Sequence, residues 1–159
     1  MCVHVCVCVG PQVLLHAYTG SGKTLAFLLP VVQSLVAAAP PPGAPPRAAP
    51  PACLVLAPSR DLAMQIFRVA DALLDGTGLC ASQAIGGANP ERQVEALRKR
   101  KPAVVVGTPG RVAELGLKQS KLNLGSVTYL VVDEADQASP RRAPAAPRRT
   151  GPPRLSSRA

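Results

Sequence analysis

Short apolar runs alternate with helical segments through most of this 159-residue chain, and that alternation is the strongest constraint on its fold. Strands are predicted at residues 13–15, 53–57, 79–85, 103–106 and 127–132. Helices are predicted at 22–36, 60–74 and 90–99, between those runs. Continuous apolar strands that alternate with helices are typical of a parallel sheet covered on both faces. The sequence therefore predicts an α/β fold with about five strands.

Capping signals indicate where two of the helices begin. Asn89 stands before a proline, so its side chain can accept from the first free N–H groups while the proline occupies the first helical position. Thr108 stands before Pro109 in the same way. In the segment 60–74 the apolar residues recur at helical spacing, and the expected core-facing stripe consists of Leu62, Ile66, Val69 and Leu73.

Three segments do not follow the strand–helix pattern. Residues 39–51 hold seven prolines and are predicted to be an exposed loop. Residues 138–159 hold six arginines and no acid, which predicts a disordered tail, with an RNA-binding basic tail as the alternative. Residues 1–11 alternate Cys and Val, and a TG dinucleotide repeat would encode that pattern. We interpret them as a low-complexity N-terminus rather than a β-strand or a Cys/His metal site, which leaves a domain at 12–137.

Net charge and apolar content narrow the class of protein. The formal charge is +9, but residues 1–137 hold 12 basic and 9 acidic side chains, so the tail supplies most of the excess. No apolar run reaches the roughly 18–20 residues of a membrane-spanning helix, and the N-terminus lacks the basic region of a secretory signal. Five cysteines do not suggest a disulfide framework. We expect a soluble intracellular protein without membrane contact, in a compartment that the sequence does not distinguish.

A glycine-rich turn stands between the first predicted strand and the first helix. Backbone N–H groups of such a turn, together with a helix N-terminus, can cradle phosphates. Lys23 would add positive charge at the outer phosphates, and the Thr24 hydroxyl can bind Mg²⁺. The candidate cofactor-binding residues of this turn are Thr19, Gly20, Ser21, Gly22, Lys23 and Thr24.

Two carboxylates follow the last predicted strand. Ligands of parallel α/β sheets gather at the carboxyl ends of the strands, where the glycine-rich turn is also expected. Asp133 can hold Mg²⁺ there, and Glu134 can orient or deprotonate an attacking water. Lys23, Asp133 and Glu134 are therefore the candidate catalytic residues, with Thr24 and Asp133 as the candidate metal ligands.

These two motifs and three others between them resemble the first RecA-like domain of the DEAD-box RNA helicases. Ala-x-Thr-Gly-Ser-Gly-Lys-Thr and Asp-Glu-Ala-Asp stand at the two ends of the similar region, which covers about residues 13–136. Pro58-Ser59-Arg60-Asp61-Leu62 is similar to the family's Pro-Thr-Arg-Glu-Leu, with two conservative departures. Gly86-Gly87 matches its glycine doublet, and Thr108-Pro109-Gly110-Arg111 matches outright.

The resemblance implies a RecA-like P-loop domain that binds ATP, Mg²⁺ and an RNA backbone. Arginine can bind phosphate through two parallel hydrogen bonds, and glycine lets a backbone approach closely. No stacking aromatics stand near these motifs, so contacts to the backbone rather than the bases are expected. The candidate RNA-binding residues are Pro58, Ser59, Arg60, Gly86, Gly87, Thr108, Pro109, Gly110 and Arg111.

Several parts of the family pattern do not occur in this sequence. Neither the adenine-reading Gln motif, nor Ser-Ala-Thr, nor a second RecA-like domain with its arginine fingers is present. The resemblance therefore implies an incomplete ATP-binding lobe that expects a second domain and does not unwind RNA alone. The alternative is a non-catalytic fragment that binds RNA or ATP. A GTPase or small-molecule kinase explains neither Thr108–Arg111 nor the acidic motif.

Overall fold

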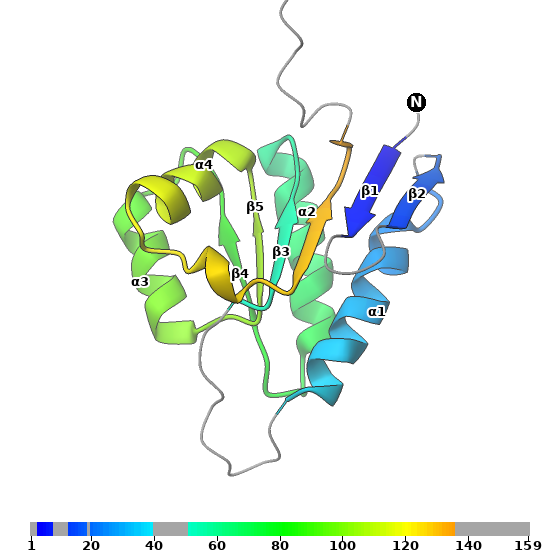
Figure 1. Ribbon diagram of the computed structural model, residues 1–159, viewed down its shortest axis with the longest axis horizontal. Helices are drawn as coiled ribbons and strands as arrows, with labels where there is room; N and C mark the ends of the chain where they lie inside the picture. Colours follow the sequence, from blue (N-terminus) through cyan, green and yellow to red (C-terminus); the bar gives the residue numbers. More distant parts are fainter. Residues whose placement is uncertain (1–2, 8–12, 19, 40–50, 136–159) are drawn as a thin grey trace, which may run out of the picture.

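The computed structural model describes residues 3–7, 13–18, 20–39 and 51–135 of the chain (Figure 1). In this part, six strands form one sheet in the order β2-β1-β6-β3-β5-β4. Strands β6, β3, β5 and β4 pair in parallel, while β1 lies antiparallel between β2 and β6. The strands are β1 Val3–Val7, β2 Val13–Ala17, β3 Cys53–Leu56, β4 Ala81–Ala84, β5 Val104–Gly107 and β6 Tyr129–Val132.

Helices pack on both faces of this sheet. They are α1 Lys23–Ala37, α2 Arg60–Leu74, α3 Pro90–Arg100 and α4 Pro109–Ala113. A π-helical turn, η1 Glu114–Lys118, continues α4, and a short 3₁₀ turn, η2 Leu124–Ser126, precedes β6. Side chains of α1 and α2 share one buried cluster, and those of α3, α4 and η1 share another. The predicted α/β sheet with helices on both faces is confirmed.

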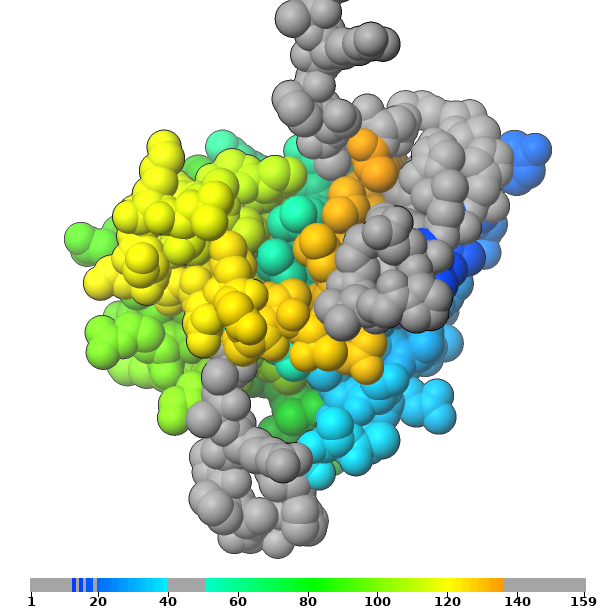
Figure 2. Space-filling model, viewed as in Figure 1, coloured from blue at the N-terminus to red at the C-terminus, as the bar shows by residue number. Residues whose placement is uncertain are grey.

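Alternation along the strands separates the two clusters. In β5, Val104 and Val106 belong to the α1–α2 cluster, while Val105 between them belongs to the other. All three are fully buried, as expected for a strand covered on both sides. The covering is thinner at β6, where the space-filling view shows its atoms at the surface beside the segment that follows α4 (Figure 2).

The helix boundaries agree closely with the sequence patterns. Helix α2 spans the predicted residues, and Asn89 caps α3 by accepting from the N–H groups of Glu91 and Arg92. Thr108 precedes α4 as predicted, but its side chain makes no capping hydrogen bond.

The stripe predicted to face the core on α2, Leu62, Ile66, Val69 and Leu73, lies at the margin of the buried face of that helix. Ile66 is buried while its other members are only partly buried, and the fully covered positions are Ala63, Ile66, Ala70 and Leu74.

The N-terminus differs most from its prediction. The strand interpretation, which we placed below low-complexity sequence for residues 1–11, is correct for Val3–Val7. Five residue pairs join β1 to β2 and two join it to β6. The predicted loop at 39–51 lies outside the described residues except for its two end residues, and the predicted tail at 138–159 lies wholly outside them. None of the described helices has both the length and the apolar content to cross a membrane.

Candidate functional site

The glycine-rich turn joins β2 to α1 at the carboxyl edge of the sheet. Gly20 and Gly22 have φ angles of 83° and 80°, which side chains with a Cβ rarely adopt. Lys23 folds back over the turn, and its Nζ donates to the carbonyl oxygens of Ala17 and Tyr18 at 2.9 Å each. The remaining predicted residues in the described turn, Ser21 and Thr24, are exposed and half-buried respectively, and Thr19 lies outside the described residues.

Asp133 follows β6 at the same edge of the sheet. Strands β2 and β6 are both antiparallel to β1, so their carboxyl ends point the same way. Asp133 is only 4% exposed, and its N–H donates to the Leu56 carbonyl at 2.9 Å. Its Oδ1 accepts from the N–H of Glu134 at 3.0 Å, within a turn in which Glu134 has a φ of 50°. The structure thus brings Lys23 and Asp133 to one edge, as predicted, with β1 between their strands.

Burial raises the pKa of Asp133 above its ordinary value of 3.8. The hydrogen bond from Glu134 and the positive charge of Lys23 both oppose that rise, but burial has the larger effect. Removing a carboxylate from water disfavours its charged form unless a cation replaces the water. Asp133 is therefore chemically suited to bind a cation, with the half-buried hydroxyl residue Thr24 as a second candidate ligand.

We expect Asp133→Asn to raise the melting temperature of the metal-free protein at pH 7. When the pKa of a carboxyl is higher in the folded than in the unfolded protein, the folded state loses stability as pH rises from the unfolded pKa to the folded pKa. The uncharged asparagine side chain removes that loss. The gain should disappear below about pH 4, where both states are protonated. Thermal unfolding across this pH range measures it. The exposed Asp75→Asn is the control, and an equal gain in both variants would contradict a specific burial effect.

A second site is an open groove of about 480 Å³ beside the carboxyl ends of β3, β4 and β5. Each of the three predicted RNA-binding segments contributes to it, and Glu114 completes the lining. Pro109 and Gly87 are the two predicted residues that do not line it. The lining residues are Pro58, Ser59, Arg60, Gly86, Thr108, Gly110, Arg111 and Glu114.

Arg60 lies directly against the glycine doublet. A Cβ on Gly86 would stand 3.5 Å from Nη2 of Arg60, and one on Gly87 would overlap the guanidinium. Gly87 also has a φ of 80°, which favours glycine. Ser59 caps α2 at this point, since its Oγ accepts from the N–H of Leu62 at 3.2 Å. Two of the predicted segments therefore meet through direct contact, and the glycines make room for the arginine.

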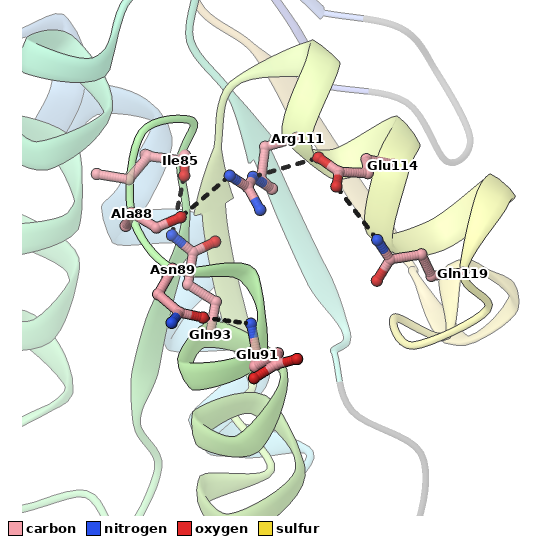
Figure 3. Close-up of polar contacts among 8 residues, drawn as sticks. All are labelled: Ile85, Ala88, Asn89, Glu91, Gln93, Arg111, Glu114 and Gln119. Carbon is pink, nitrogen blue, oxygen red and sulfur yellow. Dashed lines mark hydrogen bonds and ion pairs between the residues drawn. The ribbon is translucent and has the colours of Figure 1, made fainter.

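Arg111 is the most buried charged side chain of the groove, at 9% exposed. Its Nη2 donates to the Ala88 carbonyl at 3.1 Å, and its Nε lies 3.5 Å from Oε2 of Glu114 (Figure 3). Among the described residues, neither Nε nor Nη1 makes a hydrogen bond. A buried guanidinium with unmatched donors is suited to bind an anion through charge-assisted hydrogen bonds.

Two residues of this site were not predicted from the sequence. Glu114 lines the groove beside Arg111, and the buried Gln93 donates from Nε2 to the Ile85 carbonyl at 2.8 Å, immediately before the glycine doublet (Figure 3). The i,i+3 spacing of Arg111 and Glu114 is a signal for a helical ion pair. Gln93 has no comparable signal, because its partner is a backbone carbonyl.

Known proteins are similar to this chain in sequence. The family model for the DEAD/DEAH box helicases matches residues 3–146. The chain is 44% identical over 128 residues to the "Probable ATP-dependent RNA helicase YfmL" of Bacillus subtilis, covering 80% of this chain and 31% of that protein. It is 42% identical to the mitochondrial "DEAD-box ATP-dependent RNA helicase 47" of Arabidopsis thaliana, covering 80% of this chain and 24% of that protein.

A solved structure supports the same relationship. The structure of Mss116p bound to ssRNA and AMP-PNP superposes with a TM-score of 0.64 at 30% identity, over 76% of this chain and 24% of that one. The parallel strands β6, β3, β5 and β4 and the helices that flank them therefore have the arrangement of a RecA-like domain. The chain spans less than a third of the length of either curated relative.

Proposed function

This chain belongs to the DEAD/DEAH box helicase family, and on that basis we propose that it is an ATP-binding lobe of an RNA helicase. The lobe holds Mg-ATP at the edge formed by Lys23 and Asp133 and an RNA backbone in the groove formed by Arg60 and Arg111. The observation that supports it best is the groove, where three segments far apart in the sequence bring two arginines and a glycine backbone into one lining.

The nucleotide edge suits a triphosphate and a divalent cation. Gly20, Ser21 and Gly22 bend the backbone ahead of α1, whose free N–H groups attract phosphate. Lys23 exchanges its two carbonyl acceptors for the outer phosphates, because a charged acceptor makes the stronger hydrogen bond. Thr24 and Asp133 hold Mg²⁺, which neutralises phosphate charge when bound. Glu134 orients the attacking water, and a role of Thr19 in nucleotide binding stays a prediction.

The groove suits a sugar–phosphate backbone rather than bases. Its donors are guanidinium groups, hydroxyls and backbone N–H groups, all of which recognise phosphate without reading sequence. Thr108 makes no capping bond, so its hydroxyl is available to a ligand. Pro58, Pro109 and Gly110 shape the loops that present these groups. The ssRNA-bound relative supports RNA as the occupant.

We expect Arg111→Ala to weaken binding of a fluorescent single-stranded RNA about tenfold, since a hydrogen-bonded charge contributes roughly 1.5–3 kcal/mol. Fluorescence anisotropy at fixed salt measures it. Arg68→Ala, which removes an exposed arginine of α2, is the matched control for net charge. Equal affinities of Arg111→Ala and Arg68→Ala would contradict a specific backbone site.

The alternative is a lobe that binds RNA or ATP without catalysis. RNA-stimulated ATP hydrolysis distinguishes the two, with Glu134→Gln as the variant that keeps the shape of the site. Hydrolysis lost in Glu134→Gln supports an enzyme, whereas binding without any hydrolysis in the unchanged chain supports a binding module. Strand separation is not part of the function proposed for these 159 residues.

A further inference from the structure

We propose that Glu114 is an internal counter-anion that occupies Arg111 in the RNA-free groove and that an RNA phosphate must displace. Glu114 thereby lowers the affinity of the groove for RNA and changes its salt dependence. This inference rests on the proposed RNA groove, and it assigns to a residue that does not itself bind RNA a role in setting the affinity of that groove.

The first step is the charge balance around Arg111. Its guanidinium is 9% exposed, and a charge so far removed from water is costly unless an opposite charge lies nearby. Among the described residues, Glu114 is the one carboxylate paired with it, at 3.5 Å. Ala88 supplies the remaining contact through a neutral carbonyl. Glu114 is therefore the group that offsets this charge.

The second step is that the pairing is weak enough to exchange. The Nε of Arg111 makes no hydrogen bond even though Oε2 of Glu114 lies near it. The Glu114 side chain is 38% exposed and lines the open groove, so it can move into solvent without disturbing the core. Its Oε1 also accepts from Nε2 of Gln119 at 3.2 Å, so Gln119 is a hydrogen-bond partner that Glu114 keeps when it leaves Arg111 (Figure 3).

The third step is competition between anions. A phosphate that bonds to Nε of Arg111 needs the unmatched donor beside which Oε2 of Glu114 lies in the free groove. It would then lie beside the Glu114 carboxylate, and two like charges at such a separation repel strongly in a partly buried site. Binding of RNA therefore requires that Glu114 turn away, toward Gln119 or solvent.

The test measures RNA affinity against salt for the full chain and two variants with the same charge change. Glu114→Gln removes the anion in the groove. Glu95→Gln removes an exposed anion of α3 that pairs with Lys99 and does not line the groove. At about 50 mM salt we expect Glu114→Gln to bind a fluorescent single-stranded RNA about fivefold more tightly, with a steeper dependence of log K on log salt. Glu95→Gln should change affinity less than twofold.

Three outcomes would overturn the proposal. Weaker binding by Glu114→Gln would mean that the carboxylate orients Arg111 rather than competes for it. Equal tightening by Glu95→Gln would mean that only net charge matters. Glu114→Gln could also tighten RNA binding by the same factor in the Arg111→Ala variant as in the unchanged chain. That result would mean that Glu114 repels RNA directly, because displacement of Glu114 from Arg111 requires the arginine.

The failure of this inference is distinguishable from failure of the proposed function. If Arg111→Ala weakens binding but Glu114→Gln does not tighten it, only the role of Glu114 is wrong. If the unchanged chain binds no better than Arg111→Ala, the RNA groove itself is wrong. Circular dichroism establishes that each variant is folded. Glu114→Asp keeps the charge on a shorter side chain and should bind RNA less tightly than Glu114→Gln, and a tie between them would count against the proposal.

Discussion

Replacing Lys23 by alanine is expected to weaken ATP binding about 100-fold at pH 7. The ammonium group is the cation that the glycine-rich turn offers to phosphate, and it already points back over that turn. Charge-assisted hydrogen bonds to a phosphate contribute roughly 1.5–3 kcal/mol each, so losing one or two of them accounts for an effect of this size. Equilibrium titration with a fluorescent ATP analogue in the presence of Mg²⁺ measures the affinity.

Lys121→Ala is the matched control, because it removes an exposed lysine far along the chain from the turn. It should leave the affinity within twofold of the unchanged chain. Lys23 also holds the carbonyls of Ala17 and Tyr18, so unfolding by urea should be measured alongside binding. Unchanged nucleotide affinity in a folded Lys23→Ala protein would contradict the proposed phosphate site.

Phe27→Ala is expected to lower the free energy of unfolding by about 3–5 kcal/mol, because it removes a large side chain and leaves a cavity. Phe27 is 1% exposed and belongs to the cluster between α1, α2 and the sheet. Domains of this size are stable by only about 5–15 kcal/mol, so the loss is a large share of the total. Urea unfolding followed by circular dichroism measures it.

Leu29→Ala on the same helix provides the comparison. Leu29 is 50% exposed, so its truncation should cost less than about 1 kcal/mol. The two variants share a helix and a change to alanine, and they differ mainly in burial. Equal losses in the two would mean that α1 does not pack on the sheet through Phe27.

Much of the fold could be predicted because local patterns determine it. The fully apolar strand Val104–Gly107 and the capping residue Asn89 both follow from neighbouring residues. The order of the strands could not be predicted in this way, because pairing joins residues distant in sequence. Strand β1 shows the difficulty, because an alternating Cys–Val run is compatible both with a low-complexity repeat and with a strand. Its pairing with β2 and β6 identifies it as a strand.

The candidate site could be predicted from the sequence to a similar extent. The resemblance to the DEAD-box helicases assigned Arg60, Gly86 and Arg111 to RNA binding, and all three line one groove. The details that decide the chemistry depend on side-chain contacts instead. The packing of Arg60 against Gly87 arises only when the loops that follow β3 and β4 meet. No periodicity in the sequence reports such contacts.

The position of β1 has a consequence for the order in which the molecule folds. Its pairing with β2 is local in the sequence, whereas its pairing with β6 joins residues 6 and 7 to residues 132 and 131. Closing so long a loop costs more entropy than forming a hairpin, so contacts at large sequence separation tend to form late. Within the described sheet, β6, which precedes Asp133, is joined to β2, which leads into the glycine-rich turn, only through β1 and this two-pair junction. The groove beside β3, β4 and β5 can thus form before the edge that holds Lys23 and Asp133 is complete.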